Sequence, residues 1–200
     1  MQVAQPRRSV LIDAIWPVSG IWREIALILA GSVLIGVSAQ VQILLPFSPV
    51  PVTGQTFAVL LLGALYGSRR GAATVVTLLV FGAFGLPVFA GGAAGLSRFA
   101  GPTAGYLLGF VLAAFVVGSL SERGWDRRPW TTAASMILGN LIIYTTGVLW
   151  LARFVGWNGV LTAGVLPFLA GDAIKIGLAM VLLPAGWRLV GRASSRSPDG

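Results

Sequence analysis

One aspartate and one lysine stand close together inside a long apolar stretch. Asp172 and Lys175 lie in the run 163–183, and Lys175 is the only lysine in the chain. On a helix, residues three positions apart share a face and are about 4.5 Å apart along the axis. Charges at membrane depth cost about 3 kcal/mol each, so they are rare and usually functional. The pair is predicted to form a polar clamp for a solute; the alternative is an ion pair that only neutralises itself.

The composition places the chain among integral membrane proteins. Of its 200 residues, 56% are hydrophobic and 10% are charged, and the mean hydropathy is +0.87. Although the net charge is +8, the arginines are scattered between apolar segments, so no nucleic-acid partner is expected. The chain has no cysteine and no histidine, which excludes disulfides, Cys/His metal sites and histidine-dependent catalysis. We therefore predict neither an enzyme nor a site for a metal or a cofactor.

The chain has six apolar segments, and each is judged against the roughly 20 residues that a helix needs to cross a bilayer. The second is short, and it and the third are candidates for lining a cavity. Because backbone groups cannot stay unpaired in hydrocarbon, the predicted fold is an all-α bundle of six transmembrane helices. We expect one membrane domain over 1–200, with an N-terminal cytoplasmic segment 1–21, a bundle 22–190 and a polar tail 191–200. The six segments are 25–45, 53–67, 71–87, 103–121, 131–152 and 164–188.

The arginines predict how the bundle is oriented. With the N-terminus inside, eleven basic residues fall on the cytoplasmic side and two fall outside. Because basic loops stay inside, both termini are expected to be cytoplasmic. Asp172 and Lys175 then lie in the outer half of the sixth segment. The cytoplasmic set is Arg7, Arg8, Arg23, Arg69, Arg70, Arg123, Arg127, Arg128, Arg188, Arg192 and Arg196, and the outer set is Arg98 and Arg153.

Two of the outer connections have unusual compositions. Residues 46–55 hold three prolines and no charge, which favours a stiff extended crossing, either as a connector or as a ligand-contacting loop. Residues 85–102 are apolar and rich in glycine. Their low polarity favours a cap folded over a pocket, and the alternative is a flexible linker. Arg98 in this second connection is a candidate partner for an anionic group; the alternative is a solvated charge.

A few polar residues lie within or at the start of apolar segments. They are Gln40 and Gln42 at the end of the first segment, Gln55 and Thr56 at the start of the second, Tyr106 at the start of the fourth, and Asn140 and Tyr144 in the fifth. Each alone is interpreted as a contact between helices, worth under about 1 kcal/mol. Together with Asp172 and Lys175 they offer enough donors and acceptors to bind a small polar head group between apolar walls.

The first segment carries small residues at four-residue spacing. Ala26 and Ala30 form one small-xxx-small face, and Ser32 and Gly36 extend another. Small residues let helix backbones approach closely. The pattern therefore predicts a tight helix contact, either within the bundle or with a partner.

Three motifs are distinctive in their order and spacing. They are Pro-Val-Pro-Val-Thr-Gly-Gln-Thr-Phe-Ala from Pro49, Gly-Pro-Thr-Ala-Gly-Tyr-Leu-Leu-Gly-Phe from Gly101, and Gly-Asp-x-x-Lys at the end of the stretch from Pro167 to Lys175. Together they resemble the BioY family, the biotin-specific substrate-binding S components of energy-coupling factor (ECF) transporters. The resemblance runs from the first segment to the end of the sixth. It implies six transmembrane helices in a bacterial or archaeal cell membrane, with loops after the first and third helices closing over a solute near the outer face.

The resemblance also implies roles for particular residues and partners. Asp172 and Lys175 match the family's biotin-contacting pair, and the Ala26-x-x-x-Ala30 pattern matches the face that meets a transmembrane coupling subunit. The implied partners are biotin, that coupling subunit (T component) and a pair of ATP-binding-cassette ATPases (A components). The chain has no G-x-x-x-x-G-K-[ST] motif, so it is expected to bind and translocate the solute while its partners use ATP.

Biotin has groups that complement such a site. Its ureido ring carries N–H donors and a carbonyl, its thiophane ring and chain are apolar, and its valerate ends in a carboxylate. Asp172 is expected to accept from the ureido N–H groups, and Lys175 to donate to the ureido carbonyl or to the carboxylate. Solutes that leave these buried charges unpaired are rejected.

Two alternatives to a biotin S component stay open. One is an S component for another vitamin. The other is an ion-coupled secondary transporter, whose inverted repeats with broken helices are not found here in convincing form.

Overall fold

Helices make up most of the chain that the computed structural model describes, which is residues 10–194. Outside these residues lie Arg7, Arg8 and Arg196, which contribute to the predicted orientation, and part of the predicted tail 191–200. The α-helices and strands are α1 (Leu11–Ile15), α2 (Ile21–Gln40), β1 (Gln42–Leu45), β2 (Ser48–Thr53), α3 (Gln55–Tyr66), α4 (Ser68–Ala83), α5 (Ala104–Glu122), α6 (Pro129–Val155), α7 (Val160–Gly164) and α8 (Leu166–Ser194). Short 3-10 turns are η1 (Ala90–Gly92), η2 (Leu96–Phe99) and η3 (Trp125–Arg127).

Each predicted apolar segment coincides with one of the longer helices. In the described part of the chain, α2, α5, α6 and the stretch through α7 and α8 are long and apolar enough to cross a membrane. The helix α3 has 12 residues and α4 has 16, with two arginines in its first turn, so both fall short of that length. The molecule is thus a mostly helical protein with four candidate membrane spans, and six crossings stay a prediction.

The sequence prediction was wrong at the end of the first segment. Helix α2 ends at Gln40, and Gln42–Leu45 then pairs antiparallel with Ser48–Thr53 as a hairpin. The fold is therefore not purely α-helical. The physical reason lies in Pro49 and Pro51, because proline lacks the amide hydrogen a helix needs and is tolerated in edge strands.

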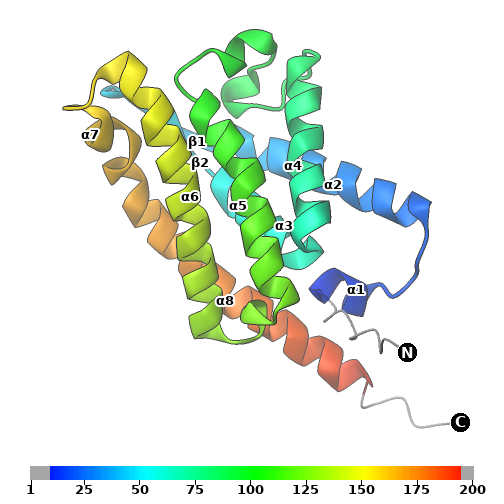
Figure 1. Ribbon diagram of the computed structural model, residues 1–200. Helices are drawn as coiled ribbons and strands as arrows, with labels where there is room; N and C mark the ends of the chain where they lie inside the picture. The colour runs from blue at the N-terminus through cyan, green and yellow to red at the C-terminus, as the bar shows by residue number, and fades with distance from the viewer. Residues whose placement is uncertain (1–9, 195–200) are drawn as a thin grey trace, which may run out of the picture.

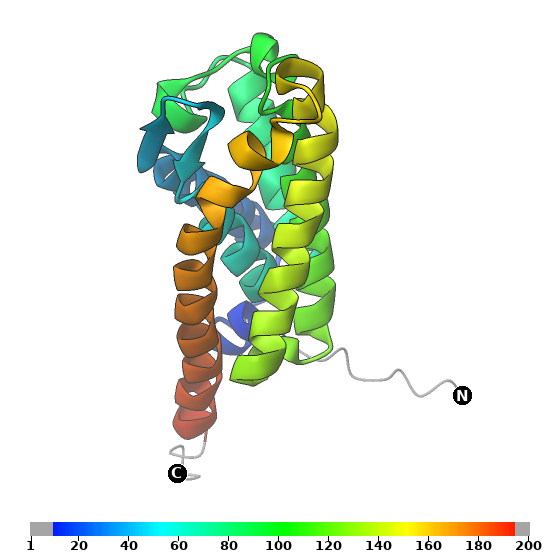
Figure 2. The ribbon, with the colours of Figure 1, turned by 90° about the vertical axis from the view of Figure 1, so that its left-hand side faces the viewer.

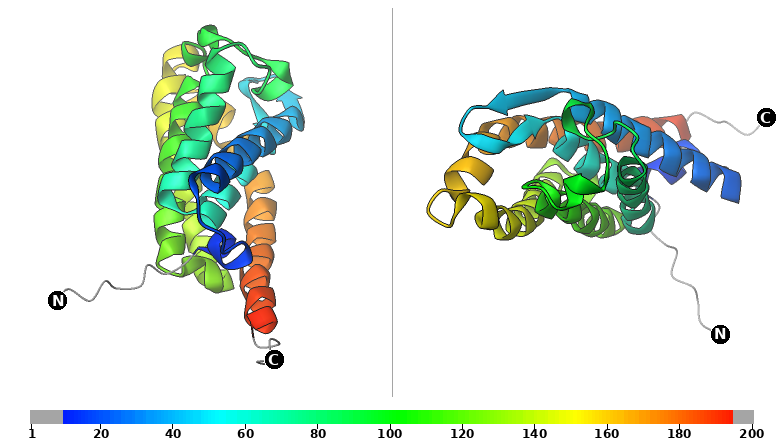
Figure 3. Two further views of the ribbon diagram at one scale, coloured as in Figure 1. Left: turned by 90° about the vertical axis from the view of Figure 1, so that its right-hand side faces the viewer. Right: turned by 90° about the horizontal axis from the view of Figure 1, so that it is seen from above.

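The long helices form a bundle in which α5 is central (Figure 1). Helix α5 packs along α6, α3 and α4, while α8 lies along α6 and α2 crosses α4 obliquely (Figure 3). Glycines permit the closest approaches: a Cβ atom on Gly63 of α3 would lie 2.8 Å from the carbonyl oxygen of Ala114 on α5. Gly118 of α5 lies in the same way against the backbone of Gly67, between α3 and α4. These three helices are consequently packed backbone to backbone.

The two ends of the bundle contain different elements. Helix α1 and the last turns of α8 lie at one end, which we call the terminal end (Figure 1). The hairpin, the connection from residue 84 to residue 103 and the turn between α6 and α7 lie at the other, which we call the loop end (Figure 2). We refer to residues 84–103 as the cap.

Charged side chains at the terminal end pair with one another. The buried Arg23 donates to Asp13 at 3.0 Å and to Glu24 at 3.3 Å. Arg70 forms ion pairs with the same two carboxylates. This network fastens α1, α2 and α4 together.

A second contact at the terminal end joins α8 to the turn between α5 and α6. The indole N–H of Trp187 donates to the buried carboxylate of Asp126 at 2.6 Å, and the Arg127 guanidinium lies 4.3 Å above the Trp187 ring. Burial raises the pKa of the Asp126 carboxyl above its ordinary value, although the Trp187 hydrogen bond and the Arg127 charge oppose the shift.

Candidate solute-binding site

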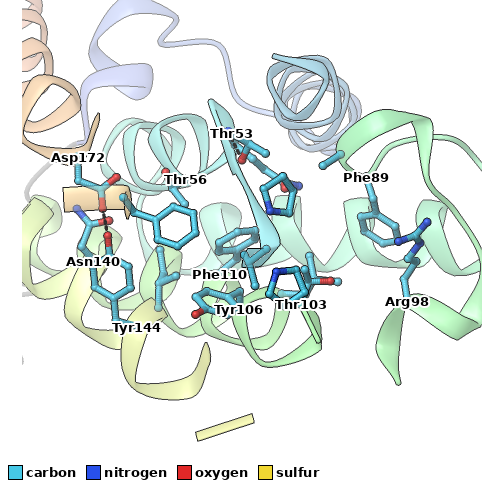
Figure 4. A pocket seen from close by; sticks show the side chains of 18 of the residues that line it. Thr53, Thr56, Phe89, Arg98, Thr103, Tyr106, Phe110, Asn140, Tyr144 and Asp172 are labelled. Carbon is cyan, nitrogen blue, oxygen red and sulfur yellow. Dashed lines mark hydrogen bonds between the residues drawn. The ribbon is translucent and has the colours of Figure 1, made fainter. Parts of the chain in front are cut away.

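A pocket lies at the loop end, between the hairpin, the cap and helices α3, α5, α6 and α8 (Figure 4). Its empty space, counted together with the open solvent at its mouth, is about 850 Å³. Small-molecule sites combine apolar walls with a few polar groups that orient the ligand. The lining residues are Pro49, Val50, Pro51, Thr53, Gln55, Thr56, Phe89, Ala90, Ala93, Arg98, Thr103, Tyr106, Leu107, Phe110, Asn140, Ile143, Tyr144, Phe168, Asp172 and Lys175.

A buried carboxylate and its hydrogen-bond donors form one end of the pocket. Asp172 accepts from the Lys175 ammonium at 3.1 Å through Oδ1 and from the Tyr144 hydroxyl through Oδ2. Lys175 also donates to the Thr53 carbonyl at 3.0 Å and to the Thr56 hydroxyl at 2.8 Å. Both charged residues lie on α8, and the other groups come from β2, α3 and α6. The arrangement ties four elements together around one aspartate.

The two charged residues differ in their capacity to bind a ligand. An ammonium has three N–H donors, and those of Lys175 already have three partners. Each carboxylate oxygen of Asp172 can accept more than one hydrogen bond, so this residue keeps acceptor capacity at the pocket wall. In chemical terms this end of the pocket suits a ligand that donates hydrogen bonds.

Two side-chain amides lie in the same pocket. Gln55 is the first residue of α3 and is 4% exposed, and its Nε2 has no hydrogen-bond partner among residues 10–194. Asn140 is one turn before Tyr144 on α6 and is also buried. A buried donor without an acceptor costs about 1–3 kcal/mol, so Gln55 is poised for an acceptor brought by a ligand or by water.

Aromatic rings form the walls between the two ends of the pocket. The rings of Tyr106 and Phe110 from α5 lie between Asp172 and Arg98 in Figure 4. The Tyr106 hydroxyl donates to the carbonyl of Gly164 at 2.8 Å, which fixes this ring against the α7–α8 turn. An apolar ring system is the natural occupant of this middle part.

An arginine stands at the opposite end of the pocket from the aspartate. Arg98 lies on η2 within the cap and is exposed, and its guanidinium has no hydrogen bond or ion pair with another described residue. In Figure 4 it lies beside Phe89, away from Asp172 and Asn140. The pocket is therefore polarised, with a hydrogen-bond-accepting end and a cationic end.

The structure brings together residues that the sequence analysis singled out separately. Asp172, Lys175, Gln55, Arg98, Tyr106 and Asn140 all line this pocket. The predicted partner-binding residues lie elsewhere, because Ala26 and Ala30 are exposed on α2, whereas Ser32 and Gly36 are buried against α4 and the cap.

Thr56 and Tyr144, which the sequence analysis also noted as polar residues of apolar segments, line the pocket too, whereas the apolar lining residues were not predicted individually. The apolar members, such as Phe89 and Phe168, are indistinguishable in sequence from residues that face lipid. Tyr144 offered a detectable signal, because it lies one turn after Asn140 in an apolar segment. Thr53 contributes a backbone carbonyl, which no side-chain pattern reveals.

Comparison with known proteins identifies relatives along most of the chain. The model of the BioY family matches residues 8–192. A probable biotin transporter BioY from Pyrococcus horikoshii is 36% identical over 80% of this chain and 93% of its own. The biotin transporter BioY of Rhodobacter capsulatus is 41% identical over 72% of this chain and 85% of its own. These relatives are transporters, not enzymes.

A solved structure has the same fold. It is a crystal structure of the S-component for biotin from an ECF-type ABC transporter, with a TM-score of 0.71 and 24% identity, and the match covers 88% of this chain and 93% of that one. The family match extends over nearly the whole described chain, including every element that lines the pocket. The chain belongs to the BioY family.

Proposed function

We propose that this protein is the biotin-binding S component of an ECF-type transporter. The observation that carries the proposal is the polarised pocket, with a buried aspartate at one end, a free arginine at the other and aromatic walls between them. Biotin has the same order of groups, from a ureido ring that donates hydrogen bonds, through an apolar bicycle and chain, to a carboxylate. The biotin transporters among its relatives support the same substrate.

In this proposal, the ureido ring lies at the aspartate end. Asp172 and Asn140 accept from the ureido N–H groups, and the free Nε2 of Gln55 donates to an oxygen of the ligand. Tyr106 and its aromatic neighbours enclose the thiophane ring, and Arg98 binds the carboxylate near the mouth.

We assign Lys175 a role beside the ligand. Its ammonium neutralises Asp172 and holds the carbonyl of Thr53, so it keeps the carboxylate in place and fastens the hairpin over the ring. In this proposal Lys175 contacts neither the ureido carbonyl nor the carboxylate, which are the two partners that the sequence analysis left open for it, and Arg98 is the proposed partner of the carboxylate.

Calorimetry on the purified protein in detergent tests the substrate. Biotin is expected to bind tightly, and thiamine and riboflavin are expected not to bind, because neither presents adjacent N–H donors and a carboxylate at opposite ends. Biotin methyl ester, which lacks the negative charge, is expected to bind more weakly than biotin. Preferential binding of thiamine or riboflavin is the result that refutes the proposal.

We further propose that the exposed face of α2 docks a transmembrane coupling subunit, which works with ABC ATPases. Ala26 and Ala30 are exposed small residues on this face, so a partner helix can approach closely. Changing either alanine to tryptophan is expected to prevent co-purification with the coupling subunit and to leave biotin binding intact. Leu141→Trp, at an exposed position on α6, is the matched control. Normal assembly of both alanine variants is the opposing result.

The proposed orientation has six crossings, the pocket facing outward and both ends of the chain in the cytoplasm, as the arginine distribution indicates. Because the chain has no cysteine, single cysteines report cleanly. Asn158→Cys in the turn between α6 and α7 is expected to react with an impermeant thiol reagent outside intact cells, and Arg128→Cys is expected not to react. The reverse pattern means the opposite orientation.

A further inference from the structure

The cap is held by apolar packing of Val88 and Phe89, by backbone hydrogen bonds to α4 and by a few side-chain hydrogen bonds. Of its residues that line the pocket, Phe89 is buried, with its ring packed into the space left by Gly82, while Arg98 is exposed. Four glycines of the cap, at positions 85, 91, 92 and 95, have positive φ angles, so its path is built for turns and not for a regular element. Such a segment opens at a low free-energy cost unless side chains from elsewhere hold it.

One side chain from α2 holds the first half of the cap. The Oε1 atom of Gln40 accepts from the backbone N–H of Gly92 at 2.9 Å. Its Nε2 donates to the carbonyl of Phe89 at 3.2 Å and to the carbonyl of Gly36 on its own helix at 2.9 Å. The side-chain amide of Gln40 thus both accepts from and donates to the same turn of the cap. Its hydrogen bond to Gly36 fixes the rotamer of the Gln40 side chain.

A different helix holds the second half of the cap. The indole N–H of Trp150 on α6 donates to the carbonyl of Gly101 at 2.9 Å, a few residues before α5 begins. The two contacts lie on either side of Arg98. The cap is also tied to α4, since the Gly95 N–H donates to the carbonyl of Gly82 at 2.7 Å. Of the two side-chain contacts, the one made by Gln40 lies on the same turn as Phe89, which lines the pocket.

We propose that Gln40 is a positioning residue that latches the cap over an occupied pocket and so determines how long a bound solute stays. Gln40 does not line the pocket, so it acts through Phe89 and its neighbours and not by touching the ligand. The choice of biotin as the test solute rests on the proposed function, whereas the contact between Gln40 and the cap does not depend on which solute is bound.

The test compares Gln40→Met with Gln42→Met. Methionine keeps the length and helix propensity of glutamine but cannot make the hydrogen bonds. Gln42 is the matched control, since its side chain lies against Gly91 of the cap and has no hydrogen bond with any residue in 10–194. Labelled biotin is bound to each purified variant, and its dissociation is followed after adding excess unlabelled biotin.

Gln40→Met is expected to speed dissociation about three- to tenfold, because it removes two hydrogen bonds to the cap that an exposed side chain makes, each worth little against competing water. Gln42→Met is expected to match the parent. Association is expected to be unchanged or faster, and the melting temperature without ligand unchanged. If Gln40 only stabilises the fold, Gln40→Met is expected to lower the melting temperature without ligand and to leave dissociation at the parent's rate. Dissociation from Gln40→Met at the parent's rate overturns the proposal.

A second readout needs no ligand. Hydrogen exchange of residues 86–95 in the unliganded protein is expected to rise in Gln40→Met and not in Gln42→Met. If the parent fails to bind biotin, the proposed substrate is wrong, and this exchange decides the latch separately. Equal exchange in the parent and in Gln40→Met refutes the latch.

Discussion

At the terminal end two arginines share two carboxylates, whereas at the loop end one lysine faces one aspartate. Asp13 and Glu24 each contact both Arg23 and Arg70, and their side chains are 34% and 30% exposed. The side chain of Asp172 is 7% exposed, and Lys175 is its only cationic partner among the described residues.

The difference distinguishes a structural ion-pair network from a ligand-binding site. In the terminal network each carboxylate keeps a partner when one arginine is lost, so the network tolerates damage. At the loop end the loss of either member leaves a buried charge, and such an arrangement is kept where the charge has a further task. Four predictions use this difference, from the largest expected effect to the smallest.

The largest effect is expected from Lys175→Met. This change leaves the Asp172 carboxylate buried with Tyr144 as its remaining donor, so we expect the free energy of unfolding to fall by about 3–5 kcal/mol. Arg70→Met at the terminal end should lower it by about 1 kcal/mol or less, because Arg23 still pairs with both carboxylates. Denaturant titration in mixed micelles measures both, and equal losses contradict the distinction between the two ends.

The double change Asp172→Asn with Lys175→Met separates stability from binding. Both charges are gone, so stability is expected to recover toward that of the parent. Biotin binding is expected to weaken about 10- to 150-fold, since a charge-assisted hydrogen bond is worth about 1.5–3 kcal/mol. A thermal shift with and without biotin measures both quantities. A double variant that keeps the parent's ligand-induced shift shows that the pair is structural only.

Arg98→Ala tests the cationic end of the pocket. The Arg98 guanidinium has no partner in the described chain, so the unliganded protein should melt as the parent does. Biotin should bind about tenfold more weakly, which corresponds to about 1.4 kcal/mol, and biotin methyl ester should bind as it does to the parent. Arg69→Ala, an exposed arginine at the terminal end, is the control and should leave affinity unchanged. Equal losses for biotin and its ester contradict a carboxylate contact.

The smallest effect is expected from Asp126→Asn. Because burial raises the pKa of Asp126 in the folded protein, its contribution to stability is fully present below the unfolded pKa and is lost as the pH rises through the folded pKa. Asparagine is always neutral and still accepts from Trp187. The variant should therefore melt a few degrees higher than the parent at pH 7, with the gap closing toward pH 4. A gap independent of pH argues against a buried charge as the cause.

The sequence predicts the fold correctly where hydropathy alone determines the secondary structure. The six apolar segments became helices because backbone groups in an apolar run must pair internally, and a helix does this locally. The extended path of residues 48–53 agrees with the stiff crossing predicted from the prolines of 46–55. The first strand was not predicted, because residues 43–45 are as apolar as the helix before them, and only pairing with the proline-containing strand across the turn makes them extended.

Lining residues of the pocket can be predicted from the sequence where their side chains differ chemically from their surroundings. Asp172, Lys175 and Arg98 stand out as charges in apolar or glycine-rich surroundings. The saturation of Lys175 by Thr53 and Thr56 depends on elements over a hundred residues away, and Gln40 reads in sequence as the polar end of a helix. Long-range hydrogen bonds of this kind need the folded chain to be seen.

The shortness of α3 has a consequence for how the protein is made. A helix of 12 residues rises about 18 Å, well short of the roughly 30 Å of hydrocarbon in a bilayer, so α3 cannot be inserted into a membrane by itself. Only Gly67 separates it from α4, and the α3–α4 pair packs closely on α5 at Ala114 and Gly118. In the proposed orientation α3 and α4 therefore enter the membrane together as one helical hairpin, which is stabilised only after α5 has been synthesised. Bulky residues at Gly63 or Gly118 should then appear as failed biogenesis and degradation by quality control, and not as a transporter with altered affinity.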